Sequence, residues 1–354
     1  MDFFDQDECR VRREQLVRAM FPEGIPRLWC PPLTHFQADG QLDTERIRAH
    51  LSALAPFVKG ILVPGSTGEG WDLSSGEVRC LLEQVLGMAR ELGMKVLIGV
   101  LHRQLADMLR TIDETVKWLA DGRTGESALE PLLAAGVVGF TVCPPSGAEL
   151  SQEDLRAGLT RVLERGYPTA IYQLPQVTGN EFSAETMAWL VALYPNFYLM
   201  KDTSGGDRVA MSGMDLGGVF LVRGAEGHYA HWWKENGGPY DGMLLSTANC
   251  LARELTGVLE LLTRGRLDEA VRLADRLDRL VQGCFAIVHG HAAANPFTNA
   301  NKILDHIMAY GPDSLQRPAP FMHGGLSLPM EFVAQAFELT RDCGLLPEQG
   351  YLST

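Results

Sequence analysis

FYLMKDT, residues 197–203, is an apolar run of strand length that ends with a lysine. Near-continuous apolar runs of this length are typical of strands in a parallel sheet that is covered on its outer face. Because a lysine ammonium is costly to bury, its place at the end of such a strand also indicates a use for the amine of Lys201.

Seven further runs of the same kind follow one another along the chain. They are RLWCPPL (27–33), GILVPG (60–65), KVLIGV (95–100), VVGFTVCP (137–144), PTAIYQLP (168–175), GVFLVRG (218–224) and YDGMLLS (240–246). Most intervening segments have helical periodicity, and some begin with helix start signals, such as Ser74 with Glu77 and Ser151 with Asp154. Strand and helix repeated eight times predict a (β/α)8 TIM barrel.

The spacing of the last three runs leaves an alternative open. Their starts at 197, 218 and 240 leave little room for helices, which must therefore be short there. A doubly wound open sheet is the second interpretation of the same strand pattern.

Three regions follow from the barrel assignment. Residues 27–249 form the barrel, 1–26 an N-terminal extension, and 250–354 a C-terminal helical region that begins with the strongly periodic segment 251–282. DGRTGES (121–127) is predicted to be a surface insertion, and no linker separates independent domains.

Charge and composition exclude several classes of partner. The chain has 31 basic and 44 acidic side chains and a net charge of -13, which opposes nonspecific binding to nucleic acid or to anionic membranes. The N-terminal sequence MDFFDQDECRVRREQL lacks the apolar segment of a secretory signal. We therefore expect a cytoplasmic protein without nucleic-acid or membrane partners, whose seven scattered cysteines stay reduced.

Two pairs of histidines have a spacing that could suggest metal ligands. His228 and His231 lie three residues apart, and His289 and His291 two apart. Because the sequence offers no recognisable third ligand for either pair, we expect no metal and interpret these histidines as ordinary polar residues.

The active site of such a barrel lies at the C-terminal ends of its strands, where Lys201 and Tyr172 stand in strands six and five. Desolvation lowers the pKa of a buried lysine, and a neutral amine can form a Schiff base with a ketone while a phenol shuttles the proton. The alternatives are that Lys201 is ion-paired with a buried carboxylate and that Tyr172 is an amphipathic core residue.

The GSTGEG turn after the second strand is a candidate anion site. It offers backbone N–H groups at glycines such as Gly65 and the hydroxyls of Ser66 and Thr67, a combination that suits a carboxylate. The alternative is a plain strand-to-helix turn.

Four ordered motifs resemble those of the dihydrodipicolinate synthase / N-acetylneuraminate lyase family of class I aldolases. GSTGEGWDLSSGE (65–77) is similar to the family's GTTGE turn, AIYQLPQVTG (170–179) to its YNxPxxTG strand, MKDTSGGD (200–207) to its Schiff-base strand, and DGMLLSTAN (241–249) to the strand that closes the barrel. NPFTNANKILDHIMAYG (295–311) also resembles the NP…K helix of the C-terminal extension.

The resemblance implies roles for individual residues. Lys201 would form the Schiff base, Tyr172 would shuttle the proton, and Ser66 and Thr67 in the turn that starts at Gly65 would bind the keto-acid carboxylate. It also implies a (β/α)8 barrel with a helical C-terminal region, a homotetramer or homodimer, and no metal or organic cofactor.

Two departures separate the chain from the synthase branch of that family. CPPSGAEL (143–150) replaces the paired tyrosines after strand four, with only Ser146 nearby, and Val177 replaces the arginine that binds the substrate carboxylate. Both argue against lysine biosynthesis. Positions that would hold the rest of a longer, sugar-derived substrate are Thr203, Glu226, Leu244 and Ser246.

These observations predict a Schiff-base-forming lyase, an aldolase or a dehydratase. Its substrate would be pyruvate or another 2-keto acid, and the departures favour a 2-keto-3-deoxy sugar acid over the substrates of a true dihydrodipicolinate synthase. The rival hypothesis is a keto-acid-binding barrel that has lost catalysis and acts as a sensor or assembly component. A third is a structural barrel whose lysine is only ion-paired.

Overall fold

The computed structural model describes residues 6–120, 129–292 and 294–352, and its eight strands form one closed parallel barrel in chain order. The strands are β1 (Leu28–Cys30), β2 (Gly60–Val63), β3 (Lys95–Val100), β4 (Val137–Val142), β5 (Thr169–Gln173), β6 (Phe197–Asp202), β7 (Phe220–Arg223) and β8 (Gly242–Leu244). Each lies within one of the eight apolar runs, so the predicted barrel is confirmed over the open sheet. The predicted insertion at 121–127 lies outside the described residues.

The described chain divides into two compact units. One comprises Met1–Arg27, Lys95–Ala225 and Pro239–Leu244, and the other comprises Leu28–Met94, Glu226–Gly238 and Leu245–Thr354.

The first unit contains β3 to β8 and the helices that flank them. These are α1 (Gln6–Met20), α4 (Leu105–Ala120), α5 (Glu130–Ala134), α6 (Gln152–Leu163), α7 (Pro175–Thr178) and α8 (Ala184–Leu193). Strands β3 to β6 are almost entirely buried, as near-continuous apolar strands with covered outer faces must be.

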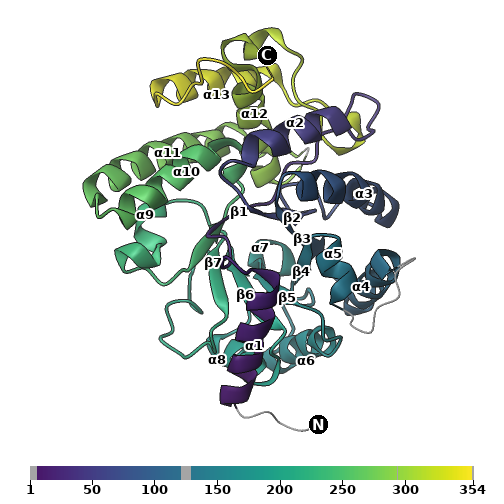
Figure 1. Ribbon diagram of the computed structural model, residues 1–354. Coiled ribbons are helices and arrows are strands. Elements are labelled where there is room, and N and C mark those ends of the chain that lie inside the picture. The colour runs from purple at the N-terminus through teal and green to yellow at the C-terminus, as the bar shows by residue number, and fades with distance from the viewer. Residues whose placement is uncertain (1–5, 121–128, 293, 353–354) are drawn as a thin grey trace. The chain divides into compact units, whose positions relative to one another are not determined.

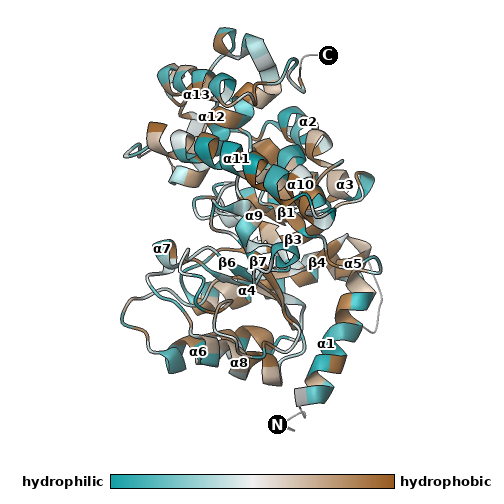
Figure 2. Cartoon of the chain, turned by 90° about the vertical axis from the view of Figure 1, so that its left-hand side faces the viewer, coloured by the Kyte–Doolittle hydropathy of each residue, from teal (hydrophilic) through white to brown (hydrophobic). Residues whose placement is uncertain are grey.

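Helix α1 of the N-terminal extension packs beside α8 and β6 (Figure 1). Its residues alternate between hydrophilic and hydrophobic along the ribbon (Figure 2). Arg13 on this helix is buried, and its guanidinium donates to the backbone oxygens of Phe197, Val191 and Tyr194. Since buried charged donors are costly unless hydrogen-bonded, these bonds fix α1 at the start of β6.

The second unit contains β1, β2 and the C-terminal helices. Its helices are α2 (Thr44–Leu54), α3 (Ser75–Glu91), α9 (Tyr229–Trp232), α10 (Ala248–Thr263), α11 (Leu267–Ile287), α12 (Pro296–Tyr310) and α13 (Met330–Asp342), with 3-10 turns η1 (Lys234–Asn236), η2 (Gly311–Gln316) and η3 (His323–Gly325). Trp29 of β1 pairs with Gly60 of β2, where a Cβ atom would lie 2.3 Å from the indole ring. Glycine is therefore needed at position 60 because the indole fills the space beside it.

The predicted helix starts are confirmed at two sites. Ser74 and Ser151 are the N-caps of α3 and α6, and each forms a capping box, with Glu77 and Asp154 respectively. Each box satisfies backbone N–H groups that the first helical turn leaves without partners.

One connection differs from the repeated strand and helix pattern. Residues 203–219, all of which the structure describes, contain no helix between β6 and β7. Four glycines in this segment, at 205, 213, 217 and 218, adopt positive φ angles, which suits turns and not a helix. The expectation of a short helix between β6 and β7 was therefore wrong. The same expectation for the connection between β7 and β8 is confirmed, because that connection contains the four-residue helix α9.

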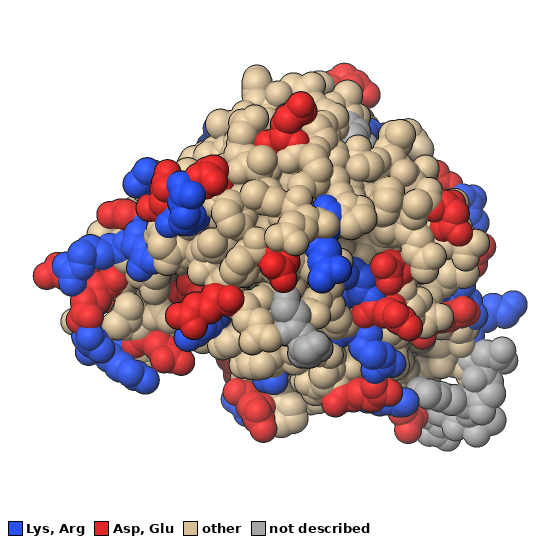
Figure 3. Space-filling model, turned by 90° about the horizontal axis from the view of Figure 1, so that it is seen from above, with Lys and Arg blue, Asp and Glu red and all other residues tan. Residues whose placement is uncertain are grey.

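None of the helices in the described parts of the chain combines the length and apolar character needed to cross a bilayer. On the face drawn in Figure 3, basic side chains are interspersed with acidic ones over the described surface. That face offers no separate basic patch of the kind that binds a phosphate backbone.

Candidate active site

Lys201 and Tyr172 lie opposite each other on neighbouring strands. In the parallel register of β5 and β6 they are direct partners, and the exposed fractions of the two residues are only 4% and 2%. The Nζ atom of Lys201 lies 4.0 Å from the centroid of the Tyr172 ring. The structure therefore brings together the two residues that the sequence predicts to be catalytic.

The space for the Lys201 side chain is provided by Gly224, directly after β7. A Cβ atom at this position would lie 2.7 Å from Cε of Lys201 and 2.2 Å from Oγ1 of Thr203. Its N–H donates to the carbonyl of Asp202 at 2.6 Å, which holds the end of β7 against β6. Any larger residue at position 224 would displace the lysine.

Thr203 follows the lysine strand and is 5% exposed. Its N–H donates to the carbonyl of Gln173, but its hydroxyl has no hydrogen-bond partner among the residues that the structure describes. Burying a hydroxyl without a hydrogen-bond partner destabilises the folded protein, and a hydrogen bond to a hydroxyl or carbonyl of a ligand would offset that cost. The assignment of Thr203 to the substrate stays a prediction.

The exit of β6 is held by a buried ion pair that the sequence analysis missed. The carboxylate of Asp207 accepts two bonds from the guanidinium of Arg223, at 2.9 and 3.0 Å, and one from the hydroxyl of Tyr240 at 2.6 Å. Asp207 has a φ of 51°, which is unusual for a residue with a side chain. The three side chains thus fix the turn that follows Lys201.

The turn after β2, Gly65 to Gly70, is compact and mostly buried. Ser66 and Thr67 are 7% and 4% exposed, and the Ser66 hydroxyl accepts a bond from the Trp71 indole at 2.9 Å. This leaves the hydroxyl proton of Ser66 as a donor. A Cβ at Gly68 would lie 2.6 Å from the carbonyl oxygen of Pro32, so that position needs glycine.

The family model described as "Dihydrodipicolinate synthetase family" matches residues 25–293. The chain belongs to this family. Among curated relatives, it is 26% identical over 272 residues to the 4-hydroxy-tetrahydrodipicolinate synthase of Agrobacterium fabrum, covering 75% of this chain and 83% of the relative. It is 29% identical over 259 residues to the enzyme of the same name from Xanthomonas axonopodis pv. citri, covering 71% and 77%.

Solved structures share the fold at lower identity. YagE, an Escherichia coli prophage protein of the dihydrodipicolinic acid synthase family in complex with pyruvate, has a TM-score of 0.71 and 19% identity, with 91% of this chain and 99% of that chain covered. A variant of the 2-keto-3-deoxygluconate aldolase of Sulfolobus solfataricus has a TM-score of 0.69 and 18% identity, with 91% and 100% covered. Because these relatives are synthases and aldolases, membership of the dihydrodipicolinate synthetase family supports a lyase activity in general.

The segment after β4 differs from the tyrosine pair of the synthase branch. Burial raises the pKa of the Cys143 thiol to about 12, against an opposing effect of Lys201, so this thiol is protonated at neutral pH. The Ser146 hydroxyl is buried without a partner among the described residues. The structure therefore places a neutral thiol and a serine hydroxyl in this segment.

Arg103 is a residue that the sequence analysis missed. It follows β3, and its guanidinium donates to the carbonyl of Val177 at 3.0 Å, while its own carbonyl accepts from the N–H of Ser146. Val177 is the position to which the resemblance in sequence assigns the arginine of the synthase branch. The guanidinium of Arg103 thus places a positive charge beside Val177. It comes from the segment after β3, where no local sequence motif indicates it.

Glu226 and Ser246, both expected to contact substrate, contact each other. The Glu226 carboxylate accepts bonds from the hydroxyls of Ser246 at 2.5 Å, Thr247 at 2.6 Å and Tyr229 at 2.9 Å, and from the N–H of Thr247 at 3.1 Å. Burial raises the pKa of Tyr229 well above its usual value, so its phenol remains a donor. Leu244, the last residue of β8, is buried.

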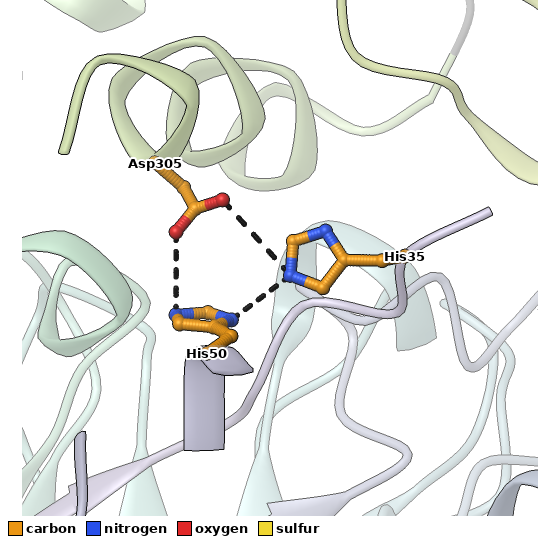
Figure 4. Close-up of side chains that lie close together, drawn as sticks. All are labelled: His35, His50 and Asp305. Atoms are coloured by element: carbon orange, nitrogen blue, oxygen red, sulfur yellow. Dashed lines mark hydrogen bonds and ion pairs between the residues drawn. The ribbon is translucent and has the colours of Figure 1, made fainter. Parts of the chain in front are cut away.

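One cluster in the described parts of the chain groups three side chains with metal-ligating atoms. His35, His50 and Asp305 offer atoms within 4.8 Å of one another, and all three are buried (Figure 4). Neither histidine pair named from the sequence belongs to it, and the side chain of His228 is 82% exposed.

The polar partners of this cluster favour a hydrogen-bonded network over a cation site. The Asp305 carboxylate pairs with Arg46 at 2.5 Å and accepts from the Tyr351 hydroxyl at 2.7 Å. Nε2 of His50 lies 2.9 Å from the carbonyl oxygen of Asn249 and therefore carries a proton, which leaves Nδ1 to accept from His35 at 3.0 Å. A metal ion here would lie beside the Arg46 guanidinium and would be repelled by it.

We expect this network to make stability depend on pH near neutrality. Burial lowers the pKa values of His35 and His50, and the charges of Arg46 and Lys302 lower that of His35 further, while Asp305 opposes the shift at His50. Below the usual pKa of histidine, the unfolded chain therefore binds protons at His35 and His50 that the folded protein does not bind. The free energy of unfolding should fall by about 1 kcal/mol or more as the pH falls from about 7.5 to about 5.5.

Urea unfolding at the two pH values checks this expectation. His50→Gln should reduce the pH dependence, whereas His289→Gln, at an exposed position, should leave it unchanged. Equal stability of the parent protein at both pH values would contradict the expectation.

Proposed function

We propose that the protein is a Schiff-base-forming lyase, an aldolase or a dehydratase, that acts on pyruvate or a longer 2-keto acid. The observation that carries the proposal is the buried Lys201 amine 4.0 Å from the Tyr172 ring centroid, on adjacent strands of a barrel of this family. Ser66 and Thr67, in the turn that starts at Gly65, are assigned to the carboxylate of the keto acid.

The chemistry follows from these groups. The Lys201 amine attacks the ketone carbon, and loss of water gives an imine whose protonated form accepts an electron pair. In aldol cleavage, the hydroxyl on the carbon two bonds from the imine carbon loses its proton. The bond from that carbon to the carbon next to the imine carbon breaks, and its electron pair moves into an enamine. The aldehyde leaves, the enamine is protonated, and water releases pyruvate.

Tyr172 is assigned to the proton transfers. As a general acid, its phenol can give a proton to the oxygen that leaves as water when the imine forms. As a general base, its phenolate can take the proton from the substrate hydroxyl when the carbon–carbon bond breaks. In a dehydration the carbon next to the imine carbon instead loses a proton to give an enamine that still carries the whole chain. This enamine expels the hydroxyl group of the following carbon, which takes up a proton and leaves as water.

A sugar-derived keto acid is the substrate class that these residues favour. Val177 and Ser146 lack the groups of the synthase branch, and Thr203 has a buried hydroxyl without a partner among the described residues. Thr203, Glu226, Leu244 and Ser246 are assigned to the remainder of that substrate. The cytoplasmic location and the homotetrameric or homodimeric assembly expected from the sequence remain predictions.

Borohydride reduction in the presence of pyruvate, followed by peptide mass spectrometry, tests the proposal. Borohydride converts an imine to a stable secondary amine, so we expect a pyruvate-sized adduct on the peptide that contains Lys201. The same experiment with longer 2-keto acids separates a pocket that excludes pyruvate from a barrel that has lost catalysis. No adduct with any of them, under conditions that label a known class I aldolase, would reject the proposal.

A further inference from the structure

Helix α12 presents one face to the turn that contains Ser66 and Thr67. Asn295, Thr298 and Lys302 are spaced by three and four residues, which places them along one side of the helix and its cap. The Asn295 amide donates to the Ser66 carbonyl at 2.8 Å, and the Thr298 hydroxyl donates to the Thr67 carbonyl at 3.0 Å. The backbone of the turn is thus fixed from the C-terminal helical region, more than 200 residues away in sequence.

Lys302 continues the same row and pairs with Glu69 in the turn. The Nζ atom lies 2.6 Å from Oε2 of Glu69, and the side chains of both residues are only 1% exposed. Lys302 also donates to the carbonyl of Phe321 at 2.6 Å, and its Nζ lies 4.8 Å from the centroid of the Phe36 ring. Because these neighbours hold the Lys302 ammonium in place, the ion pair with Lys302 holds the carboxylate of Glu69 in place as well.

The backbone of Glu69 is in an unfavourable conformation. Its φ is 60°, a left-handed value that residues with side chains seldom adopt. The Oε1 atom of Glu69 accepts from the N–H of His323 at 2.8 Å, and its Oε2 atom is in the ion pair with Lys302. A buried ion pair adds little net stability because desolvation offsets the attraction, but it does favour one arrangement of its partners.

We propose that Thr298 and Lys302 of α12 are positioning residues that hold the Ser66–Glu69 turn in the conformation that binds the substrate carboxylate. The role of that turn rests on the proposed function. The consequence is that the C-terminal helical region sets the affinity for 2-keto acids without contacting them. Small displacements of hydrogen-bond donors weaken ligand binding strongly, so loss of these contacts should act on binding before it acts on chemistry.

Two variants test the inference. The double variant Glu69→Gln with Lys302→Met neutralises both charges at similar volume and leaves no charge unpaired, and Thr298→Val removes one hydroxyl at constant shape. The control is Arg48→Met with Glu91→Gln, which neutralises an ion pair of the same unit at side chains that are 54% and 62% exposed.

The first readout is the pyruvate concentration that gives half-maximal borohydride labelling of Lys201. We expect it to rise about tenfold in the double variant and about threefold in Thr298→Val, with maximal labelling unchanged and the control equal to the parent protein. An unchanged concentration, or a loss of maximal labelling alone, would overturn the inference. If the double variant fails to fold, Thr298→Val carries the same test.

The second readout does not depend on activity. The N–H groups of Gly68, Glu69 and Gly70 are hydrogen-bonded within the turn, to the carbonyls of Gly65 and Ser66. Hydrogen exchange of the peptide that spans them should become faster in both variants and stay unchanged in the control. If pyruvate fails to label the parent protein, the proposed function fails for pyruvate, and this exchange alone decides the role of α12: unchanged exchange rejects it.

Discussion

We expect that replacing Lys201 with methionine will remove the adduct with pyruvate and lower turnover by at least about a factor of 10⁴. Methionine keeps the length and apolar stem of the side chain but has no amine, so no imine can form and no electron sink is available for bond cleavage. Turnover is measured as pyruvate released from 2-keto-3-deoxy sugar acids, coupled to lactate dehydrogenase and followed as NADH oxidation.

Two controls show whether the loss of activity in Lys201→Met comes from the missing amine. Lys117→Met, on the exposed side of α4, is the matched control and should retain the activity and labelling of the parent protein. Circular dichroism and the urea midpoint should show Lys201→Met to be folded, because methionine suits a site where the parent residue is only 4% exposed. Turnover above a hundredth of the parent value would exclude an imine mechanism at this residue.

The sequence predicts the barrel well because each strand can be recognised from its own contiguous residues. A strand whose two faces are both covered needs apolar residues at nearly every position, and eight such runs of six to eight residues stand out against amphipathic surroundings. Capping boxes such as Ser74 with Glu77 are also local. The connection between β6 and β7 was misjudged because the barrel pattern was extended to a segment whose own glycines favour turns.

The site is only partly predictable for a related reason. Lys201 is visible because a charge at the end of an apolar run is conspicuous, and Tyr172 because it stands in the neighbouring predicted strand. The contacts between Lys302 and Glu69, and between Arg103 and Val177, join segments that are distant along the chain. Neither pair follows a local pattern, because which strand ends meet is settled by packing and not by periodicity.

The occupied carboxylate of Glu226 illustrates a limit of assigning roles by position. A family position identified Glu226 and Ser246 as substrate contacts, but only the structure shows that three protein hydroxyls and one N–H already bond to the carboxylate of Glu226. Their effect on a sugar hydroxyl therefore depends on the geometry of the whole network, which sequence cannot give.

Tyr172→Phe should lower kcat by about 10²-fold to 10⁴-fold while leaving imine formation with pyruvate largely intact. Phenylalanine retains the ring beside Nζ of Lys201 and removes only the hydroxyl that is assigned to proton transfer. Labelling by borohydride should therefore reach the same maximum, although more slowly, because water loss from the first adduct also needs a proton. The lactate dehydrogenase assay and the time course of labelling measure the two effects separately.

The matched control for this variant is Tyr198→Phe. Tyr198 is a buried tyrosine of β6 whose hydroxyl donates to the carbonyl of Val138 at 3.0 Å. Its loss should cost about 1 kcal/mol of stability and leave kcat unchanged, since this hydroxyl serves only the fold. If Tyr172→Phe behaved like this control, with lower stability and unaltered kcat, then Tyr172 would be a packing residue, and proton transfer would have to come from another group near Lys201.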